Sequence, residues 1–151
     1  MLIRKAVKQD LDKIYFIERD SFPEPWSKTF FTYFIDSPDS IFLVAVEEDV
    51  IGYIICSIEL LNAFNKRFNI GHLQNLAVQK EYRRRKIASN LLNTLLEEIS
   101  KYKPLTIYLE VACSNQAAVQ LYLKFNFTII SVIQKYYRKN GDAYLMAKTI
   151  L

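Results

Sequence analysis

The chain alternates between short apolar runs, which are typical of β-strands, and stretches whose apolar positions recur with the spacing of an α-helix. The clearest helix begins at Ile87 and ends before Pro104, which cannot continue it. Its apolar stripe is Leu91, Leu92, Leu95, Leu96 and Ile99. One face of this helix is therefore expected to pack against a sheet.

Strands and helices succeed one another along the whole sequence. Three further helices are expected, which begin near Asp10, after Ser27 and after Ser114 or Asn115, because serine and asparagine are favourable N-caps. The predicted strands are residues 2–7, 41–46, 50–58, 70–78, 105–111, 127–134 and 143–149. The expected connections are an acidic hairpin turn at 47–49, a polar connector at 62–69 and a turn at 139–142. This order predicts an α/β sheet that is covered by helices on both faces.

Composition narrows the class of protein. The chain has 151 residues, of which 51% are hydrophobic and 24% charged, as expected for one compact domain rather than a disordered chain. Its apolar runs are far shorter than the roughly 18 residues of a membrane span, and residues 1–5 lack the pattern of a secretory signal. The low number of cysteines, two, fits a reducing compartment. These two cysteines and the single histidine offer no familiar set of metal ligands. We therefore expect a cytoplasmic protein that holds no metal and no membrane segment.

A basic cluster lies immediately before the helix at Ile87, within a chain of net charge +4. It comprises Lys80, Arg83, Arg84, Arg85 and Lys86. A helix N-terminus presents unpaired N–H groups, so basic side chains at this point predict a site for a phosphate-bearing ligand. A solvated charged face and a nucleic-acid contact remain open alternatives at this stage.

Six ordered blocks of the sequence carry a family resemblance. They are SFPEPWS at residues 21–27, GHLQNLAV at 71–78, YRRRKIA at 82–88, LEV at 109–111, NQAAVQLY at 115–122, and Tyr136-Tyr137 followed by DAYLM at 142–146. Together they resemble the GNAT acetyltransferases, most closely the RimI and archaeal Ard1-like protein N-terminal acetyltransferases. The resemblance covers nearly the whole chain and implies a single GNAT domain at residues 1–151. The implied fold is a mixed, mostly antiparallel central sheet of about seven strands flanked by about four helices.

The resemblance also implies a site for acetyl-CoA as cosubstrate. In this family the backbone at Leu76, Ala77 and Val78 pairs with the pantetheine arm like an added strand. The following loop takes the pyrophosphate, with Arg84, Arg85, Lys86, Ile87, Ala88 and Ser89 as the implied contacts. Asn115 lies near the cofactor arm in the family, and a role as a helix cap is compatible with that position.

Two positions depart from the family pattern. Lys86 stands where the family has the first glycine of its phosphate loop. Because glycine permits close backbone approach and unusual dihedral angles, this lysine indicates either a displaced loop or a charge placed directly on a phosphate. After the fourth helix, Asn126 replaces the usual glycine, and asparagine is the next best residue for a left-handed helix end.

Acetyl transfer from a thioester to an amine needs a base for the amine and a proton for the departing thiolate. By resemblance Glu110, an acidic residue within a β-forming run, is the general base and Tyr122 is the general acid. The alternatives are a solvent-facing strand carboxylate for Glu110 and a core aromatic for Tyr122. Since a buried hydroxyl still requires a partner, the second alternative leaves the Tyr122 hydroxyl to be explained.

Four further residues are implied to bind the substrate. Glu24, between two prolines, and His72 match positions that contribute to catalysis or to recognition of the peptide amino terminus, while surface and structural roles are their alternatives. Tyr136 and Tyr137 are expected to wall the peptide groove, with ordinary strand packing as the alternative.

The sequence therefore predicts an enzyme that transfers acetyl from acetyl-CoA to the amino-terminal residue of proteins, with ribosomal proteins and nascent chains as the implied substrates. An acetyltransferase acting on lysine side chains or small amines is the alternative within the same fold. A non-catalytic nucleic-acid or ribosome-binding module is the alternative of another class, and contact with nucleic acid is otherwise expected only through the ribosome. The oligomeric state is left open.

Overall fold

The structure, a computed structural model, describes residues 1–139 and 141–150. Within them seven strands form one sheet in the order β1-β2-β3-β4-β5-β7-β6. The strands are β1 (Leu2–Lys5), β2 (Ser40–Val46), β3 (Val50–Ala63), β4 (Lys66–Val78), β5 (Thr106–Ala112), β6 (Thr128–Tyr137) and β7 (Gly141–Thr149). The helices are α1 (Leu11–Ser21), α2 (Lys28–Asp36), α3 (Ile87–Ser100) and α4 (Gln116–Lys124), with short 3-10 turns at Lys8–Asp10 and Lys80–Tyr82. The predicted mixed sheet with helices on both faces is confirmed.

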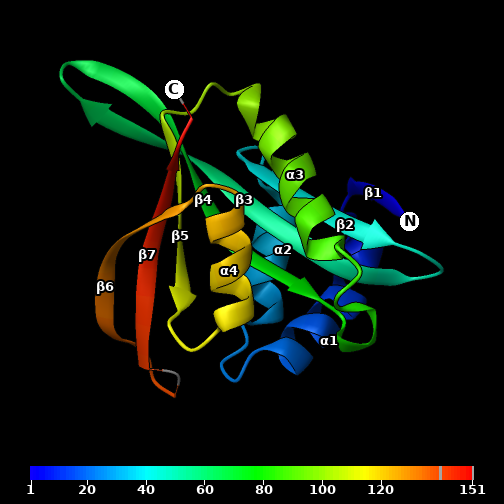
Figure 1. Cartoon of the computed structure of the whole chain (residues 1–151). Helices are drawn as coiled ribbons and strands as arrows, with labels where there is room; N and C mark the ends of the chain where they lie inside the picture. Colours follow the sequence, from blue (N-terminus) through cyan, green and yellow to red (C-terminus); the bar gives the residue numbers. More distant parts are fainter. Residues whose placement is uncertain (140, 151) are drawn as a thin grey trace.

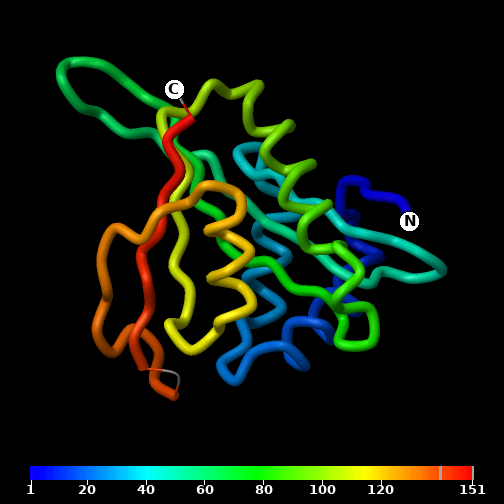
Figure 2. The backbone as a smooth tube through the Cα atoms, in the orientation of Figure 1, coloured from blue at the N-terminus to red at the C-terminus, as the bar shows by residue number. Residues whose placement is uncertain are grey.

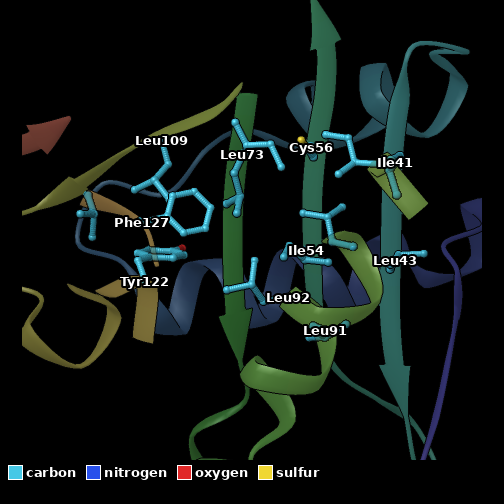
Figure 3. Close-up of a cluster of buried hydrophobic side chains, with 14 of the residues drawn as sticks. Ile41, Leu43, Ile54, Cys56, Leu73, Leu91, Leu92, Leu109, Tyr122 and Phe127 are labelled. Carbon is cyan, nitrogen blue, oxygen red and sulfur yellow. The ribbon is translucent and has the colours of Figure 1, made fainter. Parts of the chain in front are cut away.

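Two hydrophobic cores lie on opposite faces of the sheet. In Figure 1, α3 and α4 lie in front of the sheet, and α1 and α2 lie behind it. Leu91, Leu92 and Leu95 of α3 are buried in the front core. In the same core the ring centre of Tyr122 on α4 lies 5.7 Å from that of Phe127 (Figure 3). The rear core joins Ile14, Ile17, Phe31 and Phe34 of the first two helices to β2 and β3. The apolar stripe predicted for the helix at Ile87 is therefore buried as expected, apart from the partly buried Leu96.

The sheet contains one parallel pair, β4 with β5, and this pair is very short. The two strands are paired only at Gly71 with Ile107 and at His72 with Tyr108. Beyond these residues the strands separate, as Figure 1 shows. A Cβ at Gly71 would lie 2.5 Å from the terminal methyl group of Ile99 on α3, so a larger residue here would force that side chain to move. Because the pairing ends at His72 and Tyr108, the edge of β4 from residue 73 to residue 78 is left unpaired on the side that faces β5.

The polar connector expected at residues 62–69 is wrong. The chain there continues the antiparallel pairing of β3 with β4 out to Ala63 and Lys66, so that the hairpin projects beyond the body of the protein (Figure 2). Its two-residue turn, Phe64 and Asn65, has positive φ angles of 53° and 60°, as in the tight turns that suit the twist of a hairpin. The polar composition of residues 62–69 did not indicate strands, because this part of the hairpin is stabilised by pairing of β3 with β4 and not by packing against the core.

Several boundaries also differ from the sequence prediction. The first helix begins at Leu11, because Asp10 instead closes a 3-10 turn, where its carboxylate accepts a hydrogen bond from Val7 N and pairs with Arg4. Of the two expected caps of α4, Asn115 is the one observed, with its Oδ1 3.3 Å from Ala118 N. The sixth strand runs three residues past the predicted end, to Tyr137. The turn expected at 139–142 includes residue 140, which lies outside the described residues.

Candidate active site

A cavity of about 880 Å³ lies where β4 and β5 separate. Its walls come from the loop between α1 and α2, from both separating strands, from the loop before α3, from α4 and from the end of β6. The sequence-predicted residues on these walls are Glu24, His72, Leu76, Ala77, Val78, Arg84, Lys86, Ile87, Ala88, Ser89, Glu110, Asn115, Tyr122, Tyr136 and Tyr137. Fifteen positions spread over more than a hundred residues thus meet around one cavity.

Arg85 is the predicted site residue that the structure places elsewhere. Its guanidinium lies 5.3 Å from the centre of the Tyr82 ring, on a separate surface pocket beside Glu47, Glu48 and Glu81. Stacking on an aromatic face and acidic neighbours both suit a guanidinium. The Arg85 side chain therefore does not line the cavity.

The loop before α3 has two residues in the left-handed region of backbone conformation. Arg84 and Lys86 adopt left-handed conformations with φ angles of 64° and 61°, and Lys86 is the residue that precedes the first turn of α3. Arg83 anchors the loop, because its Nε donates to the carbonyl of Val78 at 3.0 Å and its Nη2 lies 3.2 Å from Ser21 Oγ. The first three residues of α3, which are Ile87, Ala88 and Ser89, line the cavity, so the free N–H groups of this helix N-terminus favour an anion there.

His72 and Glu110 form a close pair on the two separating strands. His72 Nε2 lies 2.7 Å from Glu110 Oε1, and each side chain is only about one-sixth exposed, at 17% and 16%. Burial acts to lower the pKa of His72, but the hydrogen bond and negative charge of Glu110, together with those of Glu59, outweigh it and raise the pKa. The pair can hold a proton taken from a ligand in the cavity.

A second carboxylate lies on the other side of the His72 ring. Glu59 Oε2 is 3.2 Å from His72 Nδ1, while the Tyr108 hydroxyl donates to Glu59 Oε1 at 2.8 Å. The rings of His72 and Tyr108 stack with their centres 4.2 Å apart. Neither Glu59 nor Tyr108 was predicted from the sequence. Tyr108 precedes Glu110 by two residues on β5, and this alternation could have indicated that the two share a face of the sheet.

Tyr122 enters the cavity from α4. The side chain is buried, and burial together with the nearby Tyr137 raises the pKa of its hydroxyl well above the usual range. The phenol therefore stays protonated at neutral pH and can donate a hydrogen bond to negative charge that develops beside it.

The loop between α1 and α2 is tied to the loop after β6. The Glu24 carboxylate accepts hydrogen bonds from the backbone N–H groups of Lys139 at 2.9 Å and Arg138 at 3.3 Å. Tyr136 and Tyr137 line the cavity beside this connection, with their rings 4.8 Å apart in an edge-to-face arrangement. Burial, with Tyr136 and Glu110 nearby, raises the pKa of Tyr137 to about 12, so its hydroxyl is neutral at physiological pH.

The sequence analysis missed a buried carboxylate at the base of the same loop. Glu18 is 1% exposed, and its carboxylate accepts hydrogen bonds from Trp26 N at 2.9 Å, from the Tyr53 hydroxyl and from the Asn75 amide. Burial raises the pKa of Glu18, although these three hydrogen bonds oppose the change. The signal was present, since Glu18 follows Ile14 by four residues on the apolar face of α1.

The described residues contain neither a cluster of metal ligands nor a membrane-spanning helix. No group of three or more histidine, cysteine or carboxylate residues in 1–139 and 141–150 is arranged to hold a metal ion. No helix in this part of the chain is long and apolar enough to cross a membrane.

The comparisons with known proteins identify the class to which this fold and cavity belong. The family model described as "Acetyltransferase (GNAT) family" matches residues 11–127. An N-alpha-acetyltransferase of Saccharolobus solfataricus is 36% identical over 98% of this chain and 92% of its own length. A putative [ribosomal protein bS18]-alanine N-acetyltransferase of Bacillus subtilis is 31% identical over 98% of this chain and 95% of its own. Among solved structures, Ard1 from Thermoplasma volcanium has a TM-score of 0.86 and 26% identity, and the match covers 99% of this chain and 97% of that one.

The chain belongs to the GNAT family of acetyltransferases. Within it the chain is close to the archaeal Ard1 and RimI-type N-alpha-acetyltransferases. The predicted family, fold and enzyme class, an acetyl-CoA-dependent N-alpha-acetyltransferase, are thereby confirmed.

Proposed function

We propose that the chain acetylates the amino-terminal residue of proteins by direct transfer from acetyl-CoA, with Glu110 as general base and Tyr122 as general acid. The observation that carries the proposal is the partly buried pair of Glu110 and His72 on the wall of the cavity between the separating strands. Residues 1–151 act as one catalytic domain.

The cosubstrate occupies the cavity from the α3 side. The edge of β4 at Leu76, Ala77 and Val78 is not paired with β5, so an extended amide chain such as pantetheine can pair with it like a strand. The pyrophosphate then lies at the N-terminus of α3, where Arg84, Lys86, Ile87, Ala88 and Ser89 line the cavity. Arg85 contributes its backbone N–H to this loop rather than its side chain.

Proton movements follow from the positions of the two ionisable groups. The amino terminus of a peptide is an ammonium at neutral pH and must lose a proton before nitrogen can attack the thioester. Glu110 accepts that proton, directly or through water, with His72 beside it. The new amide bond forms as the carbon–sulfur bond breaks, and Tyr122 donates its hydroxyl proton to the departing thiolate. Direct transfer needs no acyl-enzyme intermediate.

The peptide enters on the side of the loop between α1 and α2. Glu24, Tyr136 and Tyr137 line the cavity there and would contact the amino terminus of the peptide. Substrates are the amino termini of nascent chains in the cytoplasm, and a ribosomal protein is a candidate because the Bacillus subtilis relative is named for the alanine of bS18.

Thiol release from acetyl-CoA tests the proposal. A panel of short peptides differing only at residue one is assayed, each peptide also with a blocked amino terminus and an internal lysine. We expect release to require a free amino terminus and to depend on the first residue. Equal reaction of blocked, lysine-containing peptides would assign the enzyme to lysine side chains, and mass spectrometry of the product locates the acetyl group.

A further inference from the structure

Glu18 is a buried carboxylate in the last turn of α1, just before the loop between α1 and α2. It contributes to the wall of the cavity, yet the residue is only 1% exposed. Taking a carboxylate out of water is costly, and an apolar residue at this position on the buried face of α1 would avoid that cost. A charge kept in such a place indicates a role beyond packing.

Three hydrogen-bond donors from three different segments converge on the two oxygens of Glu18. The backbone N–H of Trp26 donates to Oε2 at 2.9 Å, while the Tyr53 hydroxyl on β3 and the Asn75 amide on β4 donate to Oε1. A carboxylate only accepts hydrogen bonds, and its two oxygens can accept all three at once. Because its oxygens are occupied in this way, Glu18 acts on a substrate only through the groups that it holds.

The loop between α1 and α2 depends on this contact because it has few backbone donors of its own. Pro23 and Pro25 lack an N–H group, and the first residue of the loop donates to the last turn of α1. The Trp26 N–H ties the far end of the loop to the Glu18 side chain. Glu24, which lines the cavity, lies between these two attachments.

We propose that Glu18 is a positioning residue that holds the loop between α1 and α2 against β4 and so places Glu24 for the amino terminus of the peptide. This inference rests on the proposed function. Asn75, which Glu18 also holds, precedes the edge of β4 at residues 76–78 where the cosubstrate is expected to pair. One side chain thereby sets the spacing between the parts of the cavity that take the two substrates.

Trp26 is the single tryptophan of the chain, so the position of the loop can be measured without enzyme turnover. Its half-exposed ring stacks on Phe30, with the ring centres 4.5 Å apart. In Glu18→Gln the side chain keeps its shape, but one oxygen becomes an NH2 group that cannot accept a hydrogen bond. The remaining oxygen satisfies the two side-chain donors, so the Trp26 N–H loses its acceptor. We expect hydrogen exchange of this N–H to accelerate about tenfold, and acrylamide to quench the fluorescence of Trp26 more strongly.

Steady-state kinetics test whether the position of the loop matters for the reaction. In Glu18→Gln we expect KM for the peptide to rise about tenfold, while KM for acetyl-CoA is unchanged. A role in stability alone would lower the concentration of active enzyme, and hence the apparent kcat, without separating the two KM values. Tyr53→Phe is the matched control, because it removes one buried donor to Glu18 and leaves the bond to Trp26 in place. It should lower the free energy of unfolding and leave KM for the peptide unchanged.

The wild type keeps the test decisive if Glu18→Gln does not fold. A Trp26 N–H that exchanges in the folded wild type as fast as in an unfolded peptide would overturn the inference. An unchanged exchange rate, or an equal rise of both KM values in Glu18→Gln, would do the same. Exchange and quenching need no turnover. If no peptide is acetylated while Trp26 responds to Glu18→Gln as expected, the proposed function fails and the role of Glu18 in holding the loop stands.

Discussion

The backbone N–H of Lys139 donates a hydrogen bond of 2.9 Å to the carboxylate of Glu24, which lines the cavity, although 115 residues separate the two in the sequence. The bond connects the loop after α1 to the loop after β6 and so holds together the two segments that surround the expected peptide site. The family resemblance implied a direct role for Glu24 in substrate binding. In the structure this carboxylate also holds the two loops together, because it accepts hydrogen bonds from two backbone N–H groups of the second loop.

Replacing Glu24 should therefore weaken peptide binding more than cofactor binding. In Glu24→Ala both backbone N–H groups lose their acceptor, and we expect KM for the peptide to rise several-fold while the affinity for acetyl-CoA is unchanged. The free energy of unfolding should fall by less than about 1 kcal/mol, because the bond lies at the surface. Steady-state kinetics and urea unfolding measure these effects. Asp20→Asn, an exposed change on α1, serves as the control, and an equal rise of both KM values would contradict the loop-clamping role.

The acid and base assignment predicts a loss of turnover without a loss of binding. Glu110→Gln removes the acceptor of the amine proton, and Tyr122→Phe removes the donor to the thiolate while keeping the ring against Phe127. We expect kcat to fall about 100-fold in each variant, a size typical of general acid or base catalysis. Calorimetry should find acetyl-CoA binding nearly unchanged. Wild-type turnover in both variants would contradict the assignment of Glu110 as general base and Tyr122 as general acid.

Glu110→Gln also changes how activity depends on pH. With the base removed, part of the remaining rate should come from peptide that has already lost its proton in solution. The rate should then keep rising toward the pKa of the peptide amino group, near 8. A plateau at the wild-type position would indicate that another group accepts the proton.

Lys86→Gly should stabilise the protein and leave acetyl-CoA binding intact. A side chain in the left-handed region costs about 1 kcal/mol, which glycine avoids, and the φ of 61° at Lys86 lies in that region. Thermal unfolding measures the gain. Lys103→Gly, at a φ of 49° and away from the cavity, is the matched control for the backbone effect alone. A large loss of affinity in Lys86→Gly but not in Lys103→Gly would show that the Lys86 ammonium itself contacts the cofactor.

Glu18 should make stability depend on pH. Its pKa is raised in the folded protein, so the folded state binds its proton more tightly than the unfolded state does. This contribution to stability is fully present below the unfolded pKa, near 4.3, and is lost as pH rises through the higher folded value. The difference in unfolding free energy between wild type and Glu18→Gln should therefore shift against the wild type as pH rises from about 4 to 7.

Urea unfolding of both proteins at several pH values provides the measurement. The titration of His72 is common to both proteins and cancels in the difference. A difference that does not change with pH would mean that Glu18 has an ordinary pKa in the folded protein.

Much of this protein could be read from its sequence, because local patterns act over short distances. The helical stripe after Ile87, the cap at Asn115 and the acidic hairpin turn at residues 47–49 all depend on neighbours a few residues away, and all three are observed. The family blocks also indicated the residues that line the cavity. The same locality explains the error at residues 62–69, where polar side chains conceal strands that are stabilised by pairing with each other.

The tertiary structure decided everything that depends on which segments meet. That Glu59 faces His72, that Glu24 reaches Lys139 and that Arg85 turns onto Tyr82 follows from strand register and loop packing. These contacts join residues that share no local pattern. The separation of β4 from β5 beyond His72 is also a tertiary feature, since it depends on how four helices and seven strands pack together. A sequence determines such contacts only through the total free energy of the whole fold. The contacts of the cavity residues could therefore be described only from the tertiary structure.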